Sequence, residues 1–249
     1  MKQRFIPPPL ISIEGYRYYK DSPSYSEYNY LKPGILSYIK RRHFEMALDL
    51  SSEYFHKCNV IDFGCNDGVF LPTLAHYFNN VLGIEVEETP LIFARRVISE
   101  MKLTNVEVMN NRGLMFRQIE DMISKEDYHV LYLLEVLEHI GRAPATMYED
   151  KIEFLKEVST LIDNDGVIVI SVPNMVGTRF LVQRLGLEVF GQKHRDVVAF
   201  ADLIRAGILF DTTNLEKCWV NGHVGFNHRK LEKFMRKSSA FLRRRPNSK

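Results

Sequence analysis

The stretch Asn59-Val-Ile-Asp-Phe-Gly-Cys-Asn-Asp-Gly-Val-Phe70 decides the fold of this chain, together with Val81-Leu-Gly-Ile-Glu-Val-Glu87 a few residues later. It reads as a short apolar strand, a turn with glycines, a helix and a second strand that ends on a carboxylate. Gly64 and Gly68 lie where the turn must bring the backbone close to a ligand. Glu85 follows Gly64 by 21 residues, where a carboxylate can accept hydrogen bonds from ribose hydroxyls. The pattern therefore predicts a βαβ unit that binds a nucleoside cofactor.

The residues inside the turn indicate the kind of cofactor. A site for a nicotinamide dinucleotide needs a second glycine two residues after the first, so that the backbone can approach the pyrophosphate. Asn66 occupies that position, although asparagine tolerates the left-handed conformation that glycine usually adopts there. The carboxylates of Asp62 and Asp67 suit positive charge better than phosphate. We therefore expect S-adenosylmethionine, which carries an ammonium and a sulfonium but no phosphate, rather than NAD.

Downstream of Val60 the sequence alternates short apolar runs with helical patterns. The expected strands are 59–64, 81–86, 105–109, 128–134 and 166–172, and the expected helices lie near 67–78, 89–102, 113–124 and 148–163. This alternation predicts an α/β fold with a Rossmann-like, doubly wound and mostly parallel sheet that helices cover on both faces. Ligands of such sheets bind beyond the carboxyl ends of the strands. We therefore expect the cofactor to contact Asp62, Gly64, Cys65, Asn66, Gly68, Glu85, Asn110 and Glu135.

Four motifs, in their order and spacing, resemble those of class I S-adenosylmethionine-dependent methyltransferases. They are the D-x-G-C-x-x-G turn at 62–68, Gly83-Ile-Glu85, Tyr128-His-Val-Leu-Tyr-Leu-Leu-Glu-Val-Leu-Glu-His-Ile140 and Gly166-Val-Ile-Val-Ile-Ser-Val-Pro-Asn174, with a weaker similarity at Gly222-His-Val-Gly-Phe-Asn-His-Arg-Lys-Leu231. Within that class the chain most resembles the branch that contains the ubiquinone-biosynthesis O-methyltransferases, over about residues 55–175. The resemblance implies S-adenosyl-L-methionine as cofactor, a hydroxyl of a small-molecule or lipid-linked acceptor as the methylated group, and Asn110 near the adenine amino group.

Glu135, Glu138 and His139 follow the fourth expected strand and are the candidates for catalysis. Methyl transfer to a hydroxyl needs aligned reactants and a group that removes the acceptor proton. If a helical turn begins at Glu135, the i, i+3 and i+4 spacing places all three side chains on one face. Two carboxylates and an imidazole so arranged can act as a base or hold a divalent cation. We expect His139 and Glu138 to be the catalytic residues.

The resemblance adds a metal site to this prediction. Glu135-Val-Leu-Glu138-His139 is similar to the E-x-x-E-H pattern with which ubiquinone O-methyltransferases and small-RNA terminal 2′-O-methyltransferases hold a metal ion, and a later histidine completes the site of the second group. His223 is the matching later histidine, with His228 as the second choice. The resemblance therefore implies Mg or Mn bound by Glu135, Glu138, His139 and His223. In the alternative, Glu138 and His139 are structural residues that cap the helix and shape the pocket.

The two ends of the chain depart from the layout of the family. We assign residues 1–50 to an N-terminal extension and residues 51–249 to the methyltransferase domain, with the acceptor region at about 174–226. The extension holds an amphipathic helix with apolar positions at Ile35, Ile39, Ala47 and Leu50. A helix at 227–239 leaves ten residues, whereas the family normally adds two antiparallel strands that complete the sheet. We therefore expect an abbreviated sheet, or a homo-oligomer or partner chain at its edge.

Composition and charge bear on location and partners. No run approaches the roughly 18 apolar residues of a membrane span, and residues 1–10 lack the apolar core of a signal peptide. The three cysteines, Cys58, Cys65 and Cys218, lack metal-site spacing and cannot all pair, which fits a reducing compartment. We therefore expect a cytoplasmic protein. Residues 228–249 contain nine Lys or Arg and one Glu. This basic C-terminal tail is either a solvated end or a contact for RNA or an acidic membrane surface. The alternative functions are thus a terminal RNA 2′-O-methyltransferase and a non-catalytic cofactor-binding relative.

Overall fold

The computed structural model describes residues 4–18, 22–123, 127–189, 199–219 and 223–238. The chain divides into two compact units. The first comprises Met1–Leu134 and Val158–Ser171, and the second comprises Glu135–Glu157 and Val172–Lys249. Each unit has a packed apolar interior of its own.

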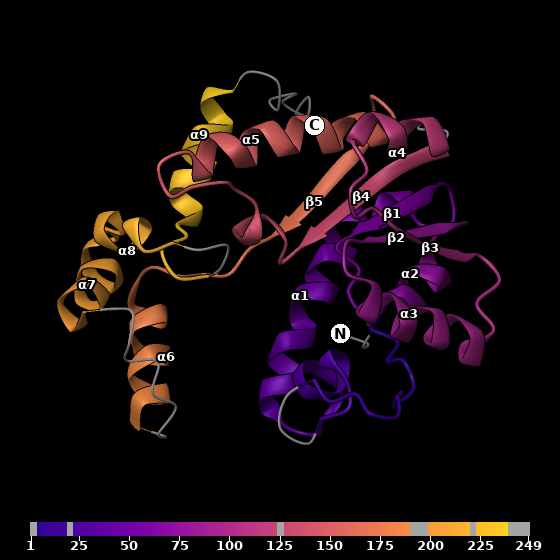
Figure 1. The fold of residues 1–249 in the computed structure, drawn as a ribbon, viewed down its shortest axis with the longest axis horizontal. Helices are drawn as coiled ribbons and strands as arrows, with labels where there is room; N and C mark the ends of the chain where they lie inside the picture. The colour runs from indigo at the N-terminus through magenta and orange to yellow at the C-terminus, as the bar shows by residue number, and fades with distance from the viewer. Residues whose placement is uncertain (1–3, 19–21, 124–126, 190–198, 220–222, 239–249) are drawn as a thin grey trace. The chain divides into compact units, whose positions relative to one another are not determined.

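The first unit is built on a sheet of five parallel strands (Figure 1). They are β1 (Asn59–Phe63), β2 (Val81–Glu85), β3 (Val106–Asn110), β4 (Tyr128–Leu134) and β5 (Val167–Ser171). Their order across the sheet is β3-β2-β1-β4-β5, so the direction in which strands are added reverses beside β1. These strands and their order confirm the predicted Rossmann-like fold class. No strand follows β5 within the ranges that the structure describes, which agrees with the abbreviated sheet.

Helices cover both faces of this sheet. α1 (Ile35–Ser51), α2 (Leu71–Tyr77) and α3 (Glu88–Met101) lie on one face, and α4 (Phe116–Met122) lies on the other (Figure 1). α2 begins later than the predicted residue 67 because Asn66 and Gly68 have positive φ angles, which a right-handed helix does not include. α3 and α4 begin close to their predicted starts.

Helix α1 packs its inner face into the core of the first unit. The ring of Phe44 stacks on Phe70, with centroids 4.5 Å apart, and on Phe5 at 5.3 Å. The helix predicted over 35–50 is confirmed, and Ala47 is buried as expected. The other apolar positions named for this helix, Ile35, Ile39 and Leu50, are exposed.

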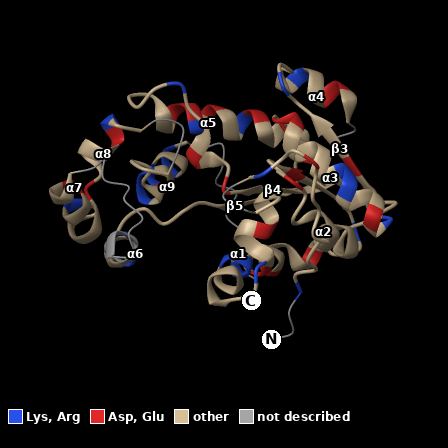
Figure 2. Cartoon of the chain, turned by 60° about the horizontal axis from the view of Figure 1, so that its bottom comes forward, with Lys and Arg blue, Asp and Glu red and all other residues tan. Residues whose placement is uncertain are grey.

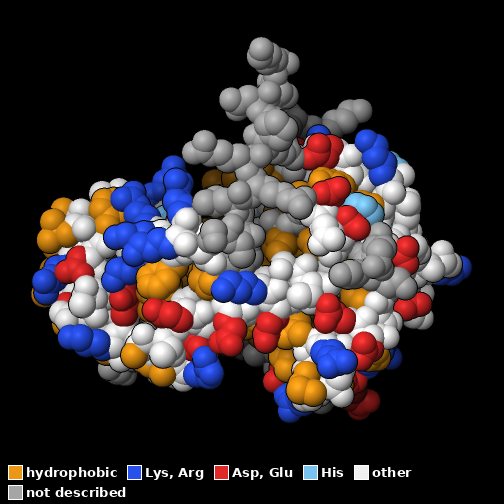
Figure 3. Space-filling model, turned by 90° about the horizontal axis from the view of Figure 1, so that it is seen from above, with side chains coloured by type: hydrophobic (Ala, Val, Ile, Leu, Met, Phe, Trp, Pro, Cys, Tyr) orange, Lys and Arg blue, Asp and Glu red, His pale blue; other side chains and the backbone are white. Residues whose placement is uncertain are grey.

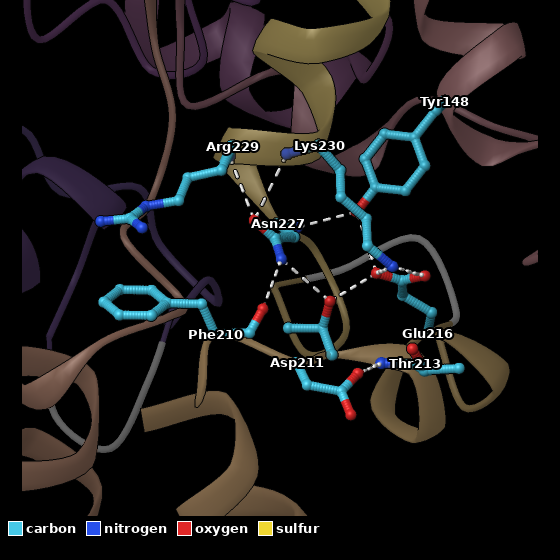
Figure 4. A network of polar contacts seen from close by, with 9 residues as sticks. Tyr148, Phe210, Asp211, Thr213, Glu216, Asn227, Arg229 and Lys230 are labelled. Carbon is cyan, nitrogen blue, oxygen red and sulfur yellow. Dashed lines mark hydrogen bonds and ion pairs between the residues drawn. The ribbon is translucent and has the colours of Figure 1, made fainter. Parts of the chain in front are cut away.

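The second unit is helical in its described residues. Its elements are η4 (Leu137–His139), α5 (Met147–Val158, whose last residue belongs to the first unit), α6 (Thr178–Val189), α7 (Phe200–Ile204), η6 (Arg205–Leu209), α8 (Thr213–Lys217) and α9 (His228–Lys237). Asn227 caps α9, because its side-chain oxygen accepts hydrogen bonds from the amides of Arg229 and Lys230 (Figure 4). The side-chain nitrogen of Asn227 donates a hydrogen bond to the hydroxyl of Thr212, which links the start of α9 to the start of α8. α9 confirms the helix predicted at 227–239.

Charged side chains are unevenly spread over the described surface. α9 is rich in basic residues (Figure 2), namely Arg229, Lys230, Lys233, Arg236 and Lys237. In the view of Figure 3, Lys and Arg side chains gather on one part of the surface. The rest of the predicted basic tail, including Arg243, Arg244 and Arg245, lies outside the described residues. Among the helices that the structure describes, none combines the length and apolar character needed to cross a membrane.

Gly68→Ala should destabilise the protein more than Gly113→Ala. Both glycines have left-handed backbone angles, with φ of 80° and 76°, where a side chain costs about 1–2 kcal/mol. At Gly68 the added Cβ would also lie 3.0 Å from the Cα of Ala94, whereas nothing lies within 4 Å at Gly113. We expect losses in the free energy of unfolding of about 1 kcal/mol for Gly113→Ala and about 2–4 kcal/mol for Gly68→Ala. Urea denaturation measures both, and equal losses would contradict the close contact.

Candidate functional site

The turn between β1 and α2 has the backbone conformation that its sequence predicts. Gly64, Asn66 and Gly68 have φ angles of 82°, 49° and 80°. The amides of Gly64 and Cys65 donate to the carbonyl oxygen of Ile84 at 2.7 and 3.1 Å, which joins the turn to β2. Asn66 therefore takes the left-handed position in which a dinucleotide site has glycine. Four of the predicted cofactor residues thus lie in a single turn.

Glu85 binds the same turn from the end of β2. Its Oε2 accepts a hydrogen bond from the amide of Asn66 at 3.0 Å. Its Oε1 accepts from the amides of Val86 and Glu87 at 2.7 and 3.0 Å. One carboxylate therefore satisfies three backbone amides from two segments of the chain. These bonds hold Glu85 at the position where the sequence predicts a contact with ribose hydroxyls.

Two further carboxyl groups, those of Asp62 and Asp67, are buried at this turn, each residue being 4% exposed. Burial, with the charge of nearby Glu85, raises the pKa of Asp62 to about 7. Burial also raises the pKa of Asp67, although the amide and hydroxyl of Ser26 donate hydrogen bonds that oppose the shift. A bound cation offsets the cost of ionising such groups. The turn therefore suits an ammonium or a sulfonium better than a diphosphate.

The sequence predicted Asn110 as a site residue but gave no indication of Ser26. Nothing in the sequence distinguishes Ser26 from its neighbouring serines, and it contacts Asp67 from 41 residues away. Asn110 ends β3, as the sequence predicts for a residue near the cofactor. Its side-chain nitrogen Nδ2 donates a hydrogen bond to Glu88 Oε2 at 2.9 Å, and its side-chain oxygen Oδ1 accepts one from the backbone amide of Arg112 at 2.8 Å. These local bonds fix the orientation of the Asn110 side chain.

In the second unit, Glu138, His139 and His223 form a compact cluster. One carboxylate oxygen and one imidazole nitrogen from each histidine all lie within 4.8 Å of one another. Glu138 Oε1 is 3.8 Å from His139 Nε2 and 3.8 Å from His223 Nδ1. The two imidazole rings are perpendicular, with centroids 5.3 Å apart. The structure thus brings together three of the four predicted metal ligands.

Glu135 is the fourth predicted ligand and does not belong to this group. It has a φ of 59°, and the 3₁₀ turn η4 begins only at Leu137. The condition for a shared face, a helical turn that begins at Glu135, is not met, so Glu135, Glu138 and His139 do not share one helical face. Glu135 affects the cluster through its charge, which contributes to the raised pKa of Glu138.

Glu138 is fully buried, and neither of its carboxyl oxygens has a hydrogen-bond partner among the described residues. Burial, followed by the charge of Glu135, raises the pKa of Glu138 to about 8, and the charge of Lys151 opposes this shift. Burial lowers the pKa of His223, whose side chain is half-exposed. At neutral pH the cluster therefore combines an imidazole that can accept a proton with a carboxyl group that holds one.

A buried frame supports the cluster. The indole nitrogen of Trp219 donates to the carbonyl oxygen of Glu138 at 3.2 Å. The ammonium of Lys151 donates to the carbonyl oxygen of Ile140 and lies 4.4 Å from the centre of the Trp219 ring. A side chain at Gly141, which has a φ of 143°, would lie 2.7 Å from the same ring. The sequence did not predict a role for Lys151, because a lysine within an amphipathic helix normally faces solvent.

The chain matches known proteins over most of its length. The sequence profile of a family described as a methyltransferase domain matches residues 32–219. The chain belongs to the methyltransferase domain family. It is 25% identical to the ubiquinone biosynthesis O-methyltransferase of Actinobacillus pleuropneumoniae serotype 7, over 82% of this chain and 88% of that protein. It is 26% identical to the enzyme of the same name from Acinetobacter baylyi, over 52% of this chain and 49% of that protein, so the match spans about half the length of that relative.

Among solved structures, the methyltransferase is similar to a putative methyltransferase from Streptococcus mutans in complex with SAH. The identity is 16% and the TM-score 0.41, over 61% of this chain and 82% of that one. The family confirms the predicted enzyme class, and the protein is an S-adenosylmethionine-dependent methyltransferase. The predicted roles of the individual site residues remain predictions.

Removing the Glu85 carboxylate should weaken binding of S-adenosylhomocysteine by this methyltransferase more than tenfold. Glu85→Ala loses charge-assisted hydrogen bonds worth about 1.5–3 kcal/mol and leaves the amide of Asn66 without its carboxylate acceptor. Glu85→Gln keeps an acceptor oxygen and should lose less. Glu87→Ala is the matched control, because Glu87 is a neighbouring exposed carboxylate that pairs with Arg112. Calorimetry that finds unchanged affinity in Glu85→Ala would reject the assignment.

Proposed function

We propose that this methyltransferase methylates a hydroxyl oxygen of a small-molecule or lipid-linked acceptor. The observation that carries the proposal is the cluster of Glu138, His139 and His223. A hydroxyl must lose its proton when it becomes a methyl ether, so an O-methyltransferase needs a proton acceptor at its site. An amine acceptor with a free lone pair has no such requirement. Two half-exposed imidazoles beside a buried carboxyl group therefore favour an oxygen acceptor.

The residues of the cluster have distinct roles in this proposal. S-Adenosylmethionine supplies, when bound, an electrophilic methyl group on a positively charged sulfur. His139 and His223 are the candidates that accept the hydroxyl proton, and the lowered pKa of His223 keeps its imidazole neutral near pH 7. Glu138 Oε1 lies 3.8 Å from one nitrogen of each imidazole, close enough for its carboxyl group to influence both rings electrostatically. The names of the ubiquinone biosynthesis O-methyltransferases also support an oxygen acceptor.

The other two functions considered from the sequence have less support. Two features favour a terminal RNA 2′-O-methyltransferase: the basic tail, of which Arg243, Arg244, Arg245 and Lys249 lie outside the described residues, and His223, which matches the later histidine of that group's metal site. The argument for a non-catalytic relative rested on the abbreviated sheet. A buried carboxyl group that has no hydrogen-bond partner in the described part of the chain is costly to maintain without a use. Its presence favours an active enzyme.

A labelled-methyl screen tests the acceptor class. The purified protein is incubated with methyl-labelled S-adenosylmethionine and cell lysate separated into lipid, RNA and small-molecule fractions. We expect label in the small-molecule or lipid fraction, on an oxygen atom identified by mass spectrometry. Label confined to RNA would establish the alternative enzyme class, and label on nitrogen would refute the proposed chemistry.

Loss of the proton acceptor should lower the rate without affecting cofactor binding. General-base catalysis contributes about 10²–10⁴-fold, so we expect His139→Ala to reduce kcat by about 100-fold or more on the acceptor found by the screen. Affinity for S-adenosylhomocysteine should stay the same. His76→Ala, at an exposed histidine of α2, is the control and should retain full activity. Activity of His139→Ala equal to that of the control would remove His139 from the reaction.

As an alternative role for the same cluster, we propose that it holds a divalent cation, in which case its imidazoles are ligands and not proton acceptors. One carboxylate and two imidazoles are a suitable donor set, and it resembles manganese sites more than the all-oxygen sites that magnesium prefers. The Glu138 carboxyl group, which has no hydrogen-bond partner among the described residues, fits this role because a cation would favour its ionised form. A bound cation would lower the pKa of an acceptor hydroxyl. Glu138, His139 and His223 are the ligands in this proposal, and Glu135 contributes negative charge nearby.

Chelation tests the metal directly. Excess EDTA should abolish methyl transfer, and added manganese or magnesium should restore it. Direct calorimetric titration with manganese should show one site that is lost in His223→Ala, while S-adenosylhomocysteine still binds. Glu138→Ala should need more metal for the same rate. Full activity in excess EDTA would end the metal proposal and leave His139 as the proton acceptor.

A further inference from the structure

Helix α1 carries apolar side chains on two opposite sides. Its inner side is buried in the first unit through residues such as Phe44 and Leu48. Its outer face, as defined here, consists of six large apolar residues that are 56–74% exposed: Ile35, Leu36, Tyr38, Ile39, Met46 and Leu50. Exposed apolar side chains on soluble proteins are normally scattered singly, and a group of them marks an interaction site.

Four residues of the outer face form a stripe with palindromic spacing. Ile35, Ile39, Met46 and Leu50 are separated by four, seven and four positions. At about 100° per residue they lie within roughly 60° of one another around the helix. The stripe therefore has the same spacing from either end, so an antiparallel copy of α1 would set Ile35 opposite Leu50 and Ile39 opposite Met46. Arg42, near the centre of the stripe, has its charge paired within the helix.

The charges near the two ends of α1 also suit an antiparallel pair. Lys32 lies just before its N-terminal end, and Asp49, which pairs with Arg4 at 2.7 Å, and Glu53 lie at its C-terminal end. This order is the reverse of what the dipole of a single helix favours. In an antiparallel pair with Ile35 opposite Leu50, Glu53 lies opposite Lys32 of the other helix. A parallel pair would bring like charges together.

We propose that the outer face of α1 docks a second copy of this chain, as an antiparallel helix pair on a twofold axis. A twofold interface uses the same surface of both partners, which explains the palindromic spacing. α1 spans 17 residues, about 25 Å, so the pair covers less than the roughly 800 Å² per partner of a standard interface. The dimer is therefore expected to be weak and reversible. An acidic membrane surface or an unrelated protein would not require self-complementary spacing.

Sedimentation velocity of the full chain, from about 1 to 500 µM, tests whether the dimer forms. Ile39→Glu and Met46→Glu should each raise the dissociation constant more than about tenfold, because each dimer carries the substitution twice. Met122→Glu is the matched control, since Met122 is 64% exposed on α4, and it should dimerise like the unmodified chain. Circular dichroism establishes that each variant is folded.

Disulfide trapping tests the direction of the pair and does not depend on the glutamate variants. Ile35→Cys and Leu50→Cys are prepared separately in a Cys218→Ser background, because Cys58 and Cys65 are buried and Cys218 is exposed. A disulfide needs Cβ atoms about 3.5–4.5 Å apart. The antiparallel pair therefore predicts a cross-linked dimer when the two variants are mixed, and none from either variant alone.

Three results would overturn the proposal. The first is a monomer at every concentration. The second is a dimer that Ile39→Glu leaves intact, or cross-linking of Ile35→Cys with itself, which would indicate another surface or a parallel pair. The third is a monomeric chain that binds vesicles of an anionic phospholipid and loses this binding in Ile39→Glu, which would make the outer face of α1 a membrane contact.

Discussion

Three backbone amides donate hydrogen bonds to the carboxylate of Glu85, and the conformation of the turn between β1 and α2 depends on them. The turn contains three residues with positive φ, a conformation that costs free energy for Asn66 and none for glycine. Glu85 compensates for this cost because it accepts a hydrogen bond from the backbone amide of Asn66. It also accepts hydrogen bonds from the amides of Val86 and Glu87, which directly follow β2. The parallel pairing of β1 with β2 in turn places these two segments side by side. The register of β1 with β2 therefore sets the position of the Glu85 carboxylate, and the carboxylate in turn stabilises the conformation of the turn.

The fold and the cofactor turn could be read from sequence because their signals are local. Parallel strands buried on both faces appear as short continuous apolar runs, and glycines mark the turn beside them. Helix α1 shows where such reasoning fails. It carries apolar residues on both sides, so its periodicity predicts a helix and leaves open which side is buried. Of the four apolar positions that the sequence marks, Ala47 is buried, whereas Ile35, Ile39 and Leu50 are exposed.

The histidine–carboxylate cluster could be predicted only in part. Glu138 and His139 are adjacent in sequence, but His223 joins them across more than eighty residues, and only the resemblance to a family pointed to it. Glu135 lies outside the group because the 3₁₀ turn begins at Leu137, two residues after it. Lys151 and Ser26 carried no signal at all. Their contacts arise from tertiary packing, which composition and periodicity do not encode.

The packing around Trp219 has a practical consequence for spectroscopy. This residue is the single tryptophan of the chain, and its indole is 1% exposed. The ring lies against the Lys151 ammonium and donates a hydrogen bond to the backbone of Glu138. Indole emission is sensitive to both neighbouring charge and hydrogen bonding. The protein therefore contains a built-in fluorophore, free of background from other indoles, whose emission reports on the backbone that carries Glu138 and His139.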